Sequence, residues 1–163
     1  MCSSDLFTGG TETGRKVASN AAMHLAPATM ELGGKSPHVV FADADLDRAA
    51  TGIVAGIFAA AGQSCVAGSR CFVQKKVFDE VVGRVVERGK QIKIGDPTQD
   101  DTELGPLALK AQLDKVERYV GYGVEDGAKL MLGGKRPQAA ELTRGWFYEP
   151  TLDRKSTRLN SSH

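Results

Sequence analysis

Three short segments carry residue types that could do chemistry, and the first holds a thiol. Cys65 lies in residues 62–70, GQSCVAGSR, an irregular stretch of small residues between a long apolar run and a predicted strand. A thiol presented on a loop by rigid elements is a good nucleophile toward a carbonyl carbon, even when only a few per cent of it is thiolate. Cys71, within the following strand, fits a buried and inert packing cysteine. Cys65 is therefore the candidate nucleophile.

The second segment holds a carboxylate. Glu31 lies on a predicted extended stretch with apolar neighbours, just before Gly33 and Gly34. A partly buried carboxylate there would have a raised pKa, within the range useful for a general base near neutrality. A solvated acid paired with Lys35 is the alternative. The residues alone leave both interpretations open.

The third segment is a glycine-rich turn, FTGGTETG at residues 7–14, between a predicted strand and a helix that Thr11 is expected to cap. The first turn of a helix has unpaired N–H groups and a positive dipole end, so it can bind a pyrophosphate without a dedicated lysine. The spacing is not G-x-G-x-x-G. An ordinary strand–turn–helix connection is therefore the competing interpretation.

Helix and strand signals alternate along the chain, which predicts an α/β fold. Asp43 or Asp45 is expected to cap the helix that begins at Leu46. The expected strands and helices occupy these ranges: strands at 6–8, 29–32, 38–41, 70–74, 129–132 and 147–151, and helices at 11–25, 46–61, 77–86 and 109–120.

Composition narrows the classes of function. The chain has 163 residues, of which 41% are hydrophobic and 25% charged, which suits one globular domain or a piece of a larger protein. A net charge of +1 offers no basic excess for nucleic acid. The uncharged run at 49–69 contains Gln63 and Ser64, so a buried helix is expected rather than a membrane span. Three cysteines without the spacing of a metal site or dithiol favour a reducing, cytoplasmic compartment.

The two ends differ from the middle. Residues 1–6 and 153–163 are polar and aperiodic, and they bury too little apolar surface to offset the entropy of ordering. They look more like translated sequencing adapter than protein, so we expect them to be non-native and disordered. Ordinary frayed termini are the alternative.

The middle of the chain, Phe7 to Leu152, resembles the aldehyde dehydrogenase superfamily. MELGGKSP at 30–37 and GQSCVAGSR at 62–70 are similar to its two active-site signatures. FTGGTETG, TELGP at 102–106 and GWFYEPT at 145–151 are similar to further motifs of the family, in the same order. One motif could arise by chance, whereas five in order could not plausibly do so.

The resemblance implies a fragment of that α/β fold. Residues 7–34 would end a Rossmann-like cofactor domain, and 35–152 would begin the catalytic domain. It implies NAD or NADP as cofactor, a small aldehyde as substrate, no metal, and a homodimeric or homotetrameric parent enzyme. Gly10 stands where many members have a serine that binds the pyrophosphate. The implied cofactor-binding residues are Gly9, Gly10, Thr11, Gly14, Leu32 and Gly33.

The resemblance also implies roles for the two catalytic candidates. Cys65 would attack the aldehyde to form a thiohemiacetal, whose hydride passes to the nicotinamide and leaves a thioester. Glu31 would then activate the water that hydrolyses this thioester. The family's second oxyanion donor, an asparagine, precedes this segment, so we expect the chain alone to be inactive.

Three other functions stay open at this point. A cysteine hydrolase would need His24 or His38 as a base beside Cys65. A coenzyme A-acylating dehydrogenase would share the thioester but would need no base for water. A nonenzymatic binding module would leave Cys65 and Glu31 far apart.

Overall fold

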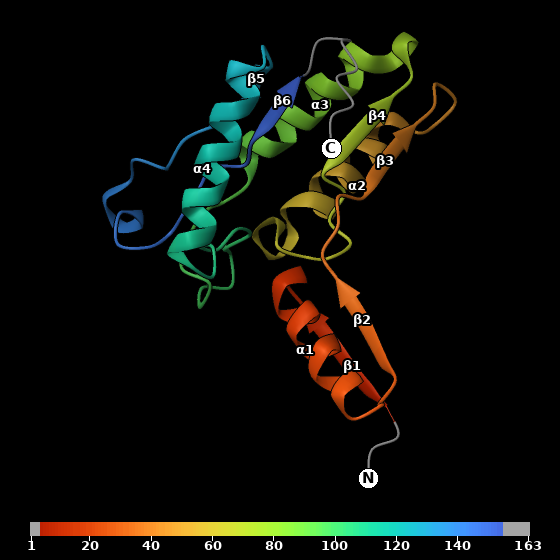
Figure 1. The fold of residues 1–163 in the computed structure, drawn as a ribbon. Coiled ribbons are helices and arrows are strands. Elements are labelled where there is room, and N and C mark those ends of the chain that lie inside the picture. The colour runs from red at the N-terminus through yellow and green to blue at the C-terminus, as the bar shows by residue number, and fades with distance from the viewer. Residues whose placement is uncertain (1–3, 155–163) are drawn as a thin grey trace.

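Strands and helices alternate along residues 4–154, the part of the chain that the computed structural model describes (Figure 1). The predicted α/β character is confirmed. Short 3-10 turns at Ala59–Gly62, Lys75–Val77 and Ala140–Leu142 join some of the main elements. Those elements, in chain order, are β1 (Asp5–Gly9), α1 (Thr11–Met23), β2 (Ala28–Leu32), β3 (Pro37–Val40), α2 (Leu46–Phe58), β4 (Arg70–Val73), α3 (Phe78–Gln91), α4 (Lys110–Glu125), β5 (Lys129–Leu132) and β6 (Leu152–Arg154).

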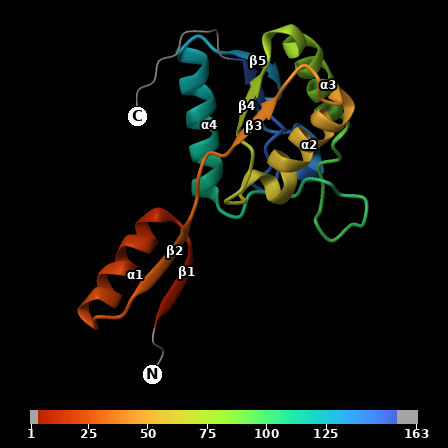
Figure 2. The same ribbon diagram turned by 90° about the vertical axis from the view of Figure 1, so that its right-hand side faces the viewer.

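A β–α–β unit forms the first lobe. β1 and β2 are parallel neighbours, with Phe7 opposite Met30, and α1 makes the crossover between them. Gly14 lets α1 lie close to the strands, because a Cβ there would come 2.8 Å from the Leu32 side chain. Figures 1 and 2 show this lobe standing apart from the rest, joined to it by the extended residues 33–36.

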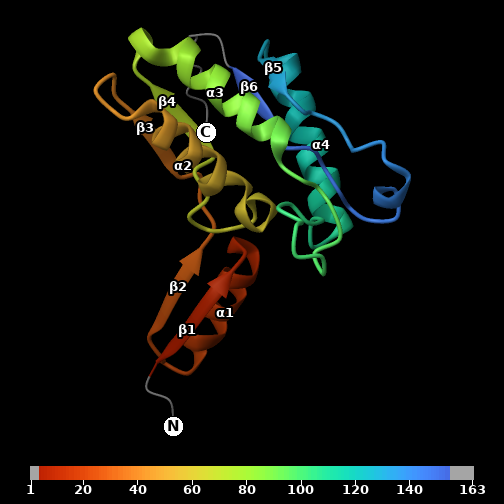
Figure 3. The same ribbon diagram turned by 180° about the vertical axis from the view of Figure 1, so that it is seen from behind.

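The second lobe contains the main hydrophobic core. β3 and β4 are parallel, and α2 and α3 lie on one face of the pair, as Figure 3 shows from behind. The apolar stripes of both helices face this core, which follows from their three-four spacing of apolar residues. Its buried members are Val40, Ala50, Ile53, Val77, Val81 and Val85.

β5 and β6 form a separate antiparallel pair beside α3 and α4. The predicted strand at 147–151 is wrong, because pairing begins only at Leu152. Phe147 is buried, and Pro150 has no N–H to donate to a ladder. The segment is held instead by isolated hydrogen bonds. In one of them the Thr151 hydroxyl oxygen accepts from the Gly134 N–H at 3.0 Å.

The disorder expected at the two ends is wrong for the positions nearest the middle. Asp5 and Leu6 belong to β1, and Asp153 and Arg154 belong to β6. A strand is held by backbone hydrogen bonds to its neighbour, so polar side chains do not prevent its pairing. Residues 1–3 and 155–163 lie outside the described residues.

The apolar run at 49–69 is helical only in its first half. α2 ends at Phe58, so the helix expected to reach residue 61 is wrong at its end. Ala60 and Ala61 have φ values of 51° and 53°, which turn the chain away from the helix axis. Within residues 4–154, none of the helices is both long and apolar enough to cross a membrane.

The structure shows which of the two candidate aspartates, Asp43 or Asp45, caps α2. An Asp45 carboxylate oxygen accepts from the N–H groups of Asp47 and Arg48, each at 3.1 Å. We expect Asp45→Ala to lower the free energy of unfolding by about 1 kcal/mol, because these N–H groups lose their partner. Asp43→Ala is the control and should change it by less than about 0.5 kcal/mol. Urea unfolding measures both, and equal effects would contradict the cap.

Candidate active site

One cleft of about 860 Å³ brings most of the candidate residues together. It is lined by the β1–α1 turn, the end of β2 with the linker after it, the cysteine segment (residues 63–69) and one face of α4. Of the residues expected in a site, Gly14 does not line it. Those that do are Gly9, Gly10, Thr11, Glu31, Leu32, Gly33 and Cys65.

A strained turn presents Cys65 to this cleft. Ala60 and Ala61, together with Gly62 at φ 71°, occupy the left-handed region directly before the cysteine segment. Such a conformation costs on the order of 1–3 kcal/mol for each non-glycine residue, so the surroundings must hold it. Cys65 itself is exposed.

The side chain of Gln63 contributes to that hold. Its Oε1 accepts from the Ala108 N–H at 3.1 Å, and its Nε2 donates to the Ala60 carbonyl oxygen at 3.3 Å. Ala108 lies just before α4, so this one side chain connects the cysteine segment with the α4 wall of the cleft. Two walls that are distant in sequence are thereby joined.

Glu31 enters the cleft from the other lobe. It lies on β2 opposite Thr8 of β1, and its side chain is exposed. The partial burial that one of the two open interpretations required is not found, because within residues 4–154 β2 pairs with a strand on one side only. Among the described residues Lys35 donates to the Gly34 carbonyl oxygen at 3.1 Å, and none of the ion pairs joins it to Glu31.

The β1–α1 turn lines the same cleft and has backbone N–H groups that no side chain caps. Thr11 is the first residue of α1, and its expected role as the cap is wrong, because Gly10 occupies that position. No side chain caps this end of the helix. The first N–H groups of α1 therefore remain available at the positive end of its dipole.

Two cleft residues were missed by sequence reasoning. Gln112 and Lys115 project from α4, three positions apart and thus on one helix face. Polar side chains on a helix are typical of a solvent-exposed face, and only the tertiary arrangement brings this face to the cleft that Cys65 lines. Lys115 brings a positive charge to the cleft.

The two histidines considered as bases lie elsewhere. The His38 ring packs over α2 and the cysteine segment, since a Cβ added at Gly56 would come 2.7 Å from its Nε2. His24 follows the far end of α1. Both belong to the described residues, and neither lines the cleft.

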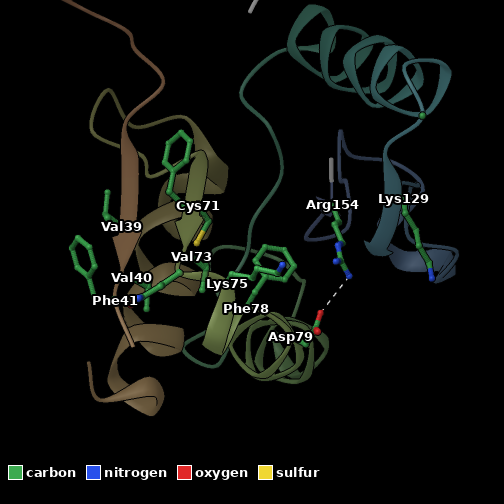
Figure 4. Close-up of a pocket in the computed structure, with 13 residues that line it drawn as sticks. Val39, Val40, Phe41, Cys71, Val73, Lys75, Phe78, Asp79, Lys129 and Arg154 are labelled. Carbon is green, nitrogen blue, oxygen red and sulfur yellow. Dashed lines mark hydrogen bonds and ion pairs between the residues drawn. The ribbon is translucent and has the colours of Figure 1, made fainter. Parts of the chain in front are cut away.

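Cys71 occupies a different groove, of about 1080 Å³, between the β3–β4 pair and β6 (Figure 4). None of the predicted site residues lines this groove. Arg154 extends across it toward Asp79, and its Nη1 lies 3.3 Å from the Asp79 Oδ1. The Arg154 guanidinium lies 4.7 Å from the Phe78 ring centre. Cys71 is exposed rather than buried as expected, although the protein around its thiol desolvates it and raises the pKa of that thiol.

The fold and the cleft define a two-lobed α/β protein in which a glycine-rich turn, a carboxylate and a thiol share one site. The sequence profile described as "Aldehyde dehydrogenase family" matches residues 6–161. The chain belongs to the aldehyde dehydrogenase family, as its motifs indicated.

The proteins similar to this chain are much longer than it. It is 47% identical over 146 residues to a betaine aldehyde dehydrogenase of Bacillus subtilis (strain 168), covering 90% of this chain and 30% of the relative. A betaine aldehyde dehydrogenase of Mesorhizobium japonicum is 49% identical over 145 residues, with 89% and 30% covered. The chain thus spans about 30% of the length of these curated relatives.

Solved structures agree with the fold. The betaine aldehyde dehydrogenase of Staphylococcus aureus in complex with NAD+ matches with a TM-score of 0.86 and 40% identity, over 91% of this chain and 29% of that one. HpcC from Thermus thermophilus matches with a TM-score of 0.86 and 45% identity, over 91% and 30%. The expected fragment of the aldehyde dehydrogenase fold is confirmed.

The environment of Cys71 predicts its reactivity. A raised pKa means less thiolate at a given pH, so its alkylation should need a higher pH in the folded chain. The test follows iodoacetamide alkylation against pH in a chain carrying Cys2→Ser and Cys65→Ser. The same chain unfolded in urea is the control and should react with a lower midpoint. Coincident curves would show that the fold does not desolvate the thiol.

Proposed function

We propose that the protein containing this chain oxidises an aldehyde to a carboxylic acid with NAD+ or NADP+. Cys65 is the nucleophile, and Glu31 is the base that activates water. The observation that carries this proposal is the single cleft shared by both side chains and the glycine-rich turn. By itself the chain is inactive, since the relatives place their activity in a polypeptide about three times as long.

The Cys65 thiol loses its proton to solvent and its sulfur attacks the aldehyde carbon, so that the carbonyl oxygen becomes an oxyanion near the Cys65 backbone N–H. The nicotinamide cofactor, when bound, accepts the hydride that leaves this carbon. The carbon remains as a thioester on Cys65. Glu31 then removes a proton from water, whose oxygen attacks the thioester and releases the acid and the free thiol.

The residues present fit a dinucleotide. The uncapped first turn of α1 supplies N–H donors for a pyrophosphate, and Gly10 and Gly33 leave open space where side chains would stand. Thr11 and Leu32 complete this wall, and Lys115 lines the cleft from α4, with its Nζ 6.0 Å from the centre of the Tyr119 ring. Gly14 contributes through close packing of α1 on β2 rather than through contact with the ligand.

The rival functions find less support in the cleft. A carboxylate in the same cleft as the thiol suits hydrolysis of the thioester, whereas transfer to coenzyme A needs no base for water. A cysteine hydrolase would need a histidine there, and neither His24 nor His38 lines it. A binding module would have no reason to bring Cys65 and Glu31 to one cavity.

The roles of Cys65 and Glu31 can be tested in a full-length chimera. Residues 7–152 replace the matching part of the Bacillus subtilis relative, and NADH formation is followed with betaine aldehyde. Cys65→Ala should lower kcat at least about 1,000-fold, because no thiohemiacetal can form. Glu31→Gln should release one equivalent of NADH per site and then slow by about 10²–10⁴-fold, because the thioester persists.

Two matched controls accompany that experiment. Cys71→Ala and Glu125→Gln change the same residue types outside the cleft and should keep the parent rate. Turnover retained by Cys65→Ala would exclude it as the nucleophile. A Glu31→Gln variant without a burst phase would exclude thioester hydrolysis as the step it serves.

The charge of Lys115 gives a second test in the same chimera. Lys115→Ala should raise the KM for NAD+ by about 3–10-fold, because a cation facing an anionic ligand is lost. Increasing salt should reduce the difference from the parent. Lys110→Ala is the control on the same helix, where Lys110 pairs with Asp114 at 2.8 Å, and it should leave this KM unchanged. An equal rise of the KM for NAD+ in both variants would show that Lys115 does not act at the cofactor site.

A further inference from the structure

The two catalytic candidates stand on different lobes, which only the linker at 33–36 joins along the chain. Glu31 belongs to the β1–α1–β2 unit, and Cys65 belongs to the lobe built on the buried core around Val81. Figures 1 and 3 show how narrow this connection is. The distance between carboxylate and thiol therefore depends on the conformation of the linker.

One residue of the second lobe holds that linker. Arg70 donates from its Nε to the Lys35 carbonyl oxygen at 2.8 Å and from its backbone N–H to the Ser36 carbonyl oxygen at 3.2 Å. It is the first residue of β4 and directly follows the cysteine segment. The linker also touches that segment, since a Cβ on Gly34 would lie 3.8 Å from the Cys65 carbonyl oxygen.

The hydrogen bond from the Arg70 side chain reaches a linker residue that the backbone pairing does not. Any residue at position 70 would donate its N–H to Ser36 at the start of the β3–β4 pairing, where Pro37 lies opposite Arg70. The guanidinium extends this hold to Lys35, beyond the end of the ladder. Hydrogen bonds from a charged donor are stronger than those between neutral groups.

We propose that Arg70 is a positioning residue, which fixes the linker so that the Glu31 and Cys65 walls of the cleft keep one spacing. The importance of this spacing for catalysis rests on the proposed function. The spacing itself is a property of the folded chain and can be measured without turnover.

The experiment measures the distance between two spin labels by double electron–electron resonance in the full chain. Cys2→Ser and Cys71→Ser leave Cys65 for one nitroxide, and Glu31→Cys takes the other. Adding Arg70→Met should make the distance distribution about twofold broader, because a linker released at one end explores more conformations. Arg118→Met, at an exposed position of α4, is the matched control and should keep the parent distribution.

An Arg70→Met distribution equal to that of the parent would overturn the proposal. Circular dichroism checks that each variant folds. If Arg70→Met does not fold, Arg70→Gln takes its place under the same criterion. The glutamine side chain is shorter and has no guanidinium to donate to Lys35. The result is independent of whether Cys65 and Glu31 are catalytic, so its failure and a failure of the proposed function are distinguishable.

Discussion

A site divided between two lobes is the constraint on which the rest of this structure depends. A thiol and a carboxylate that act on one carbonyl must meet within the length of a small molecule, yet Cys65 and Glu31 lie in separately packed units. Residues 33–36 provide the covalent connection. The bonds from Arg70 to the carbonyl groups of Lys35 and Ser36 restrict it. The proposed chemistry therefore depends on a few hydrogen bonds outside the hydrophobic core.

Each wall of the cleft is held by contacts of its own. On one side, close packing of α1 against β2 at Gly14 aims the uncapped helix end at the cleft. On the other, the left-handed turn at Ala60 and Ala61 stops α2 and turns the chain toward Cys65. The core packing of α2 and the bonds of Gln63 offset the strain of that turn. Strain concentrated beside a reactive group is typical of functional sites.

The two described cysteines lie in different environments. Cys71 lies on a strand, beside an apolar groove, where desolvation raises the pKa of its thiol and lowers its thiolate fraction. Cys65 lies on an irregular segment, exposed to a cleft with polar residues from three other parts of the chain. The groove at Cys71 is the larger of the two, so size alone would not select the cleft that Cys65 lines.

The sequence by itself determined the local chemistry and most of the elements. Apolar spacing identified α2 and α3, the motifs around Glu31 and Cys65 identified the family, and an aspartate before Leu46 identified a cap. Only the tertiary structure placed Gln112 and Lys115 in the cleft, exposed Glu31 and left Pro150 before the last strand instead of within one. Local patterns report the conformation of neighbouring residues, whereas these features depend on contacts between segments far apart in the chain. That is why the sequence could name the candidate catalytic groups, whereas the fold decides what surrounds them.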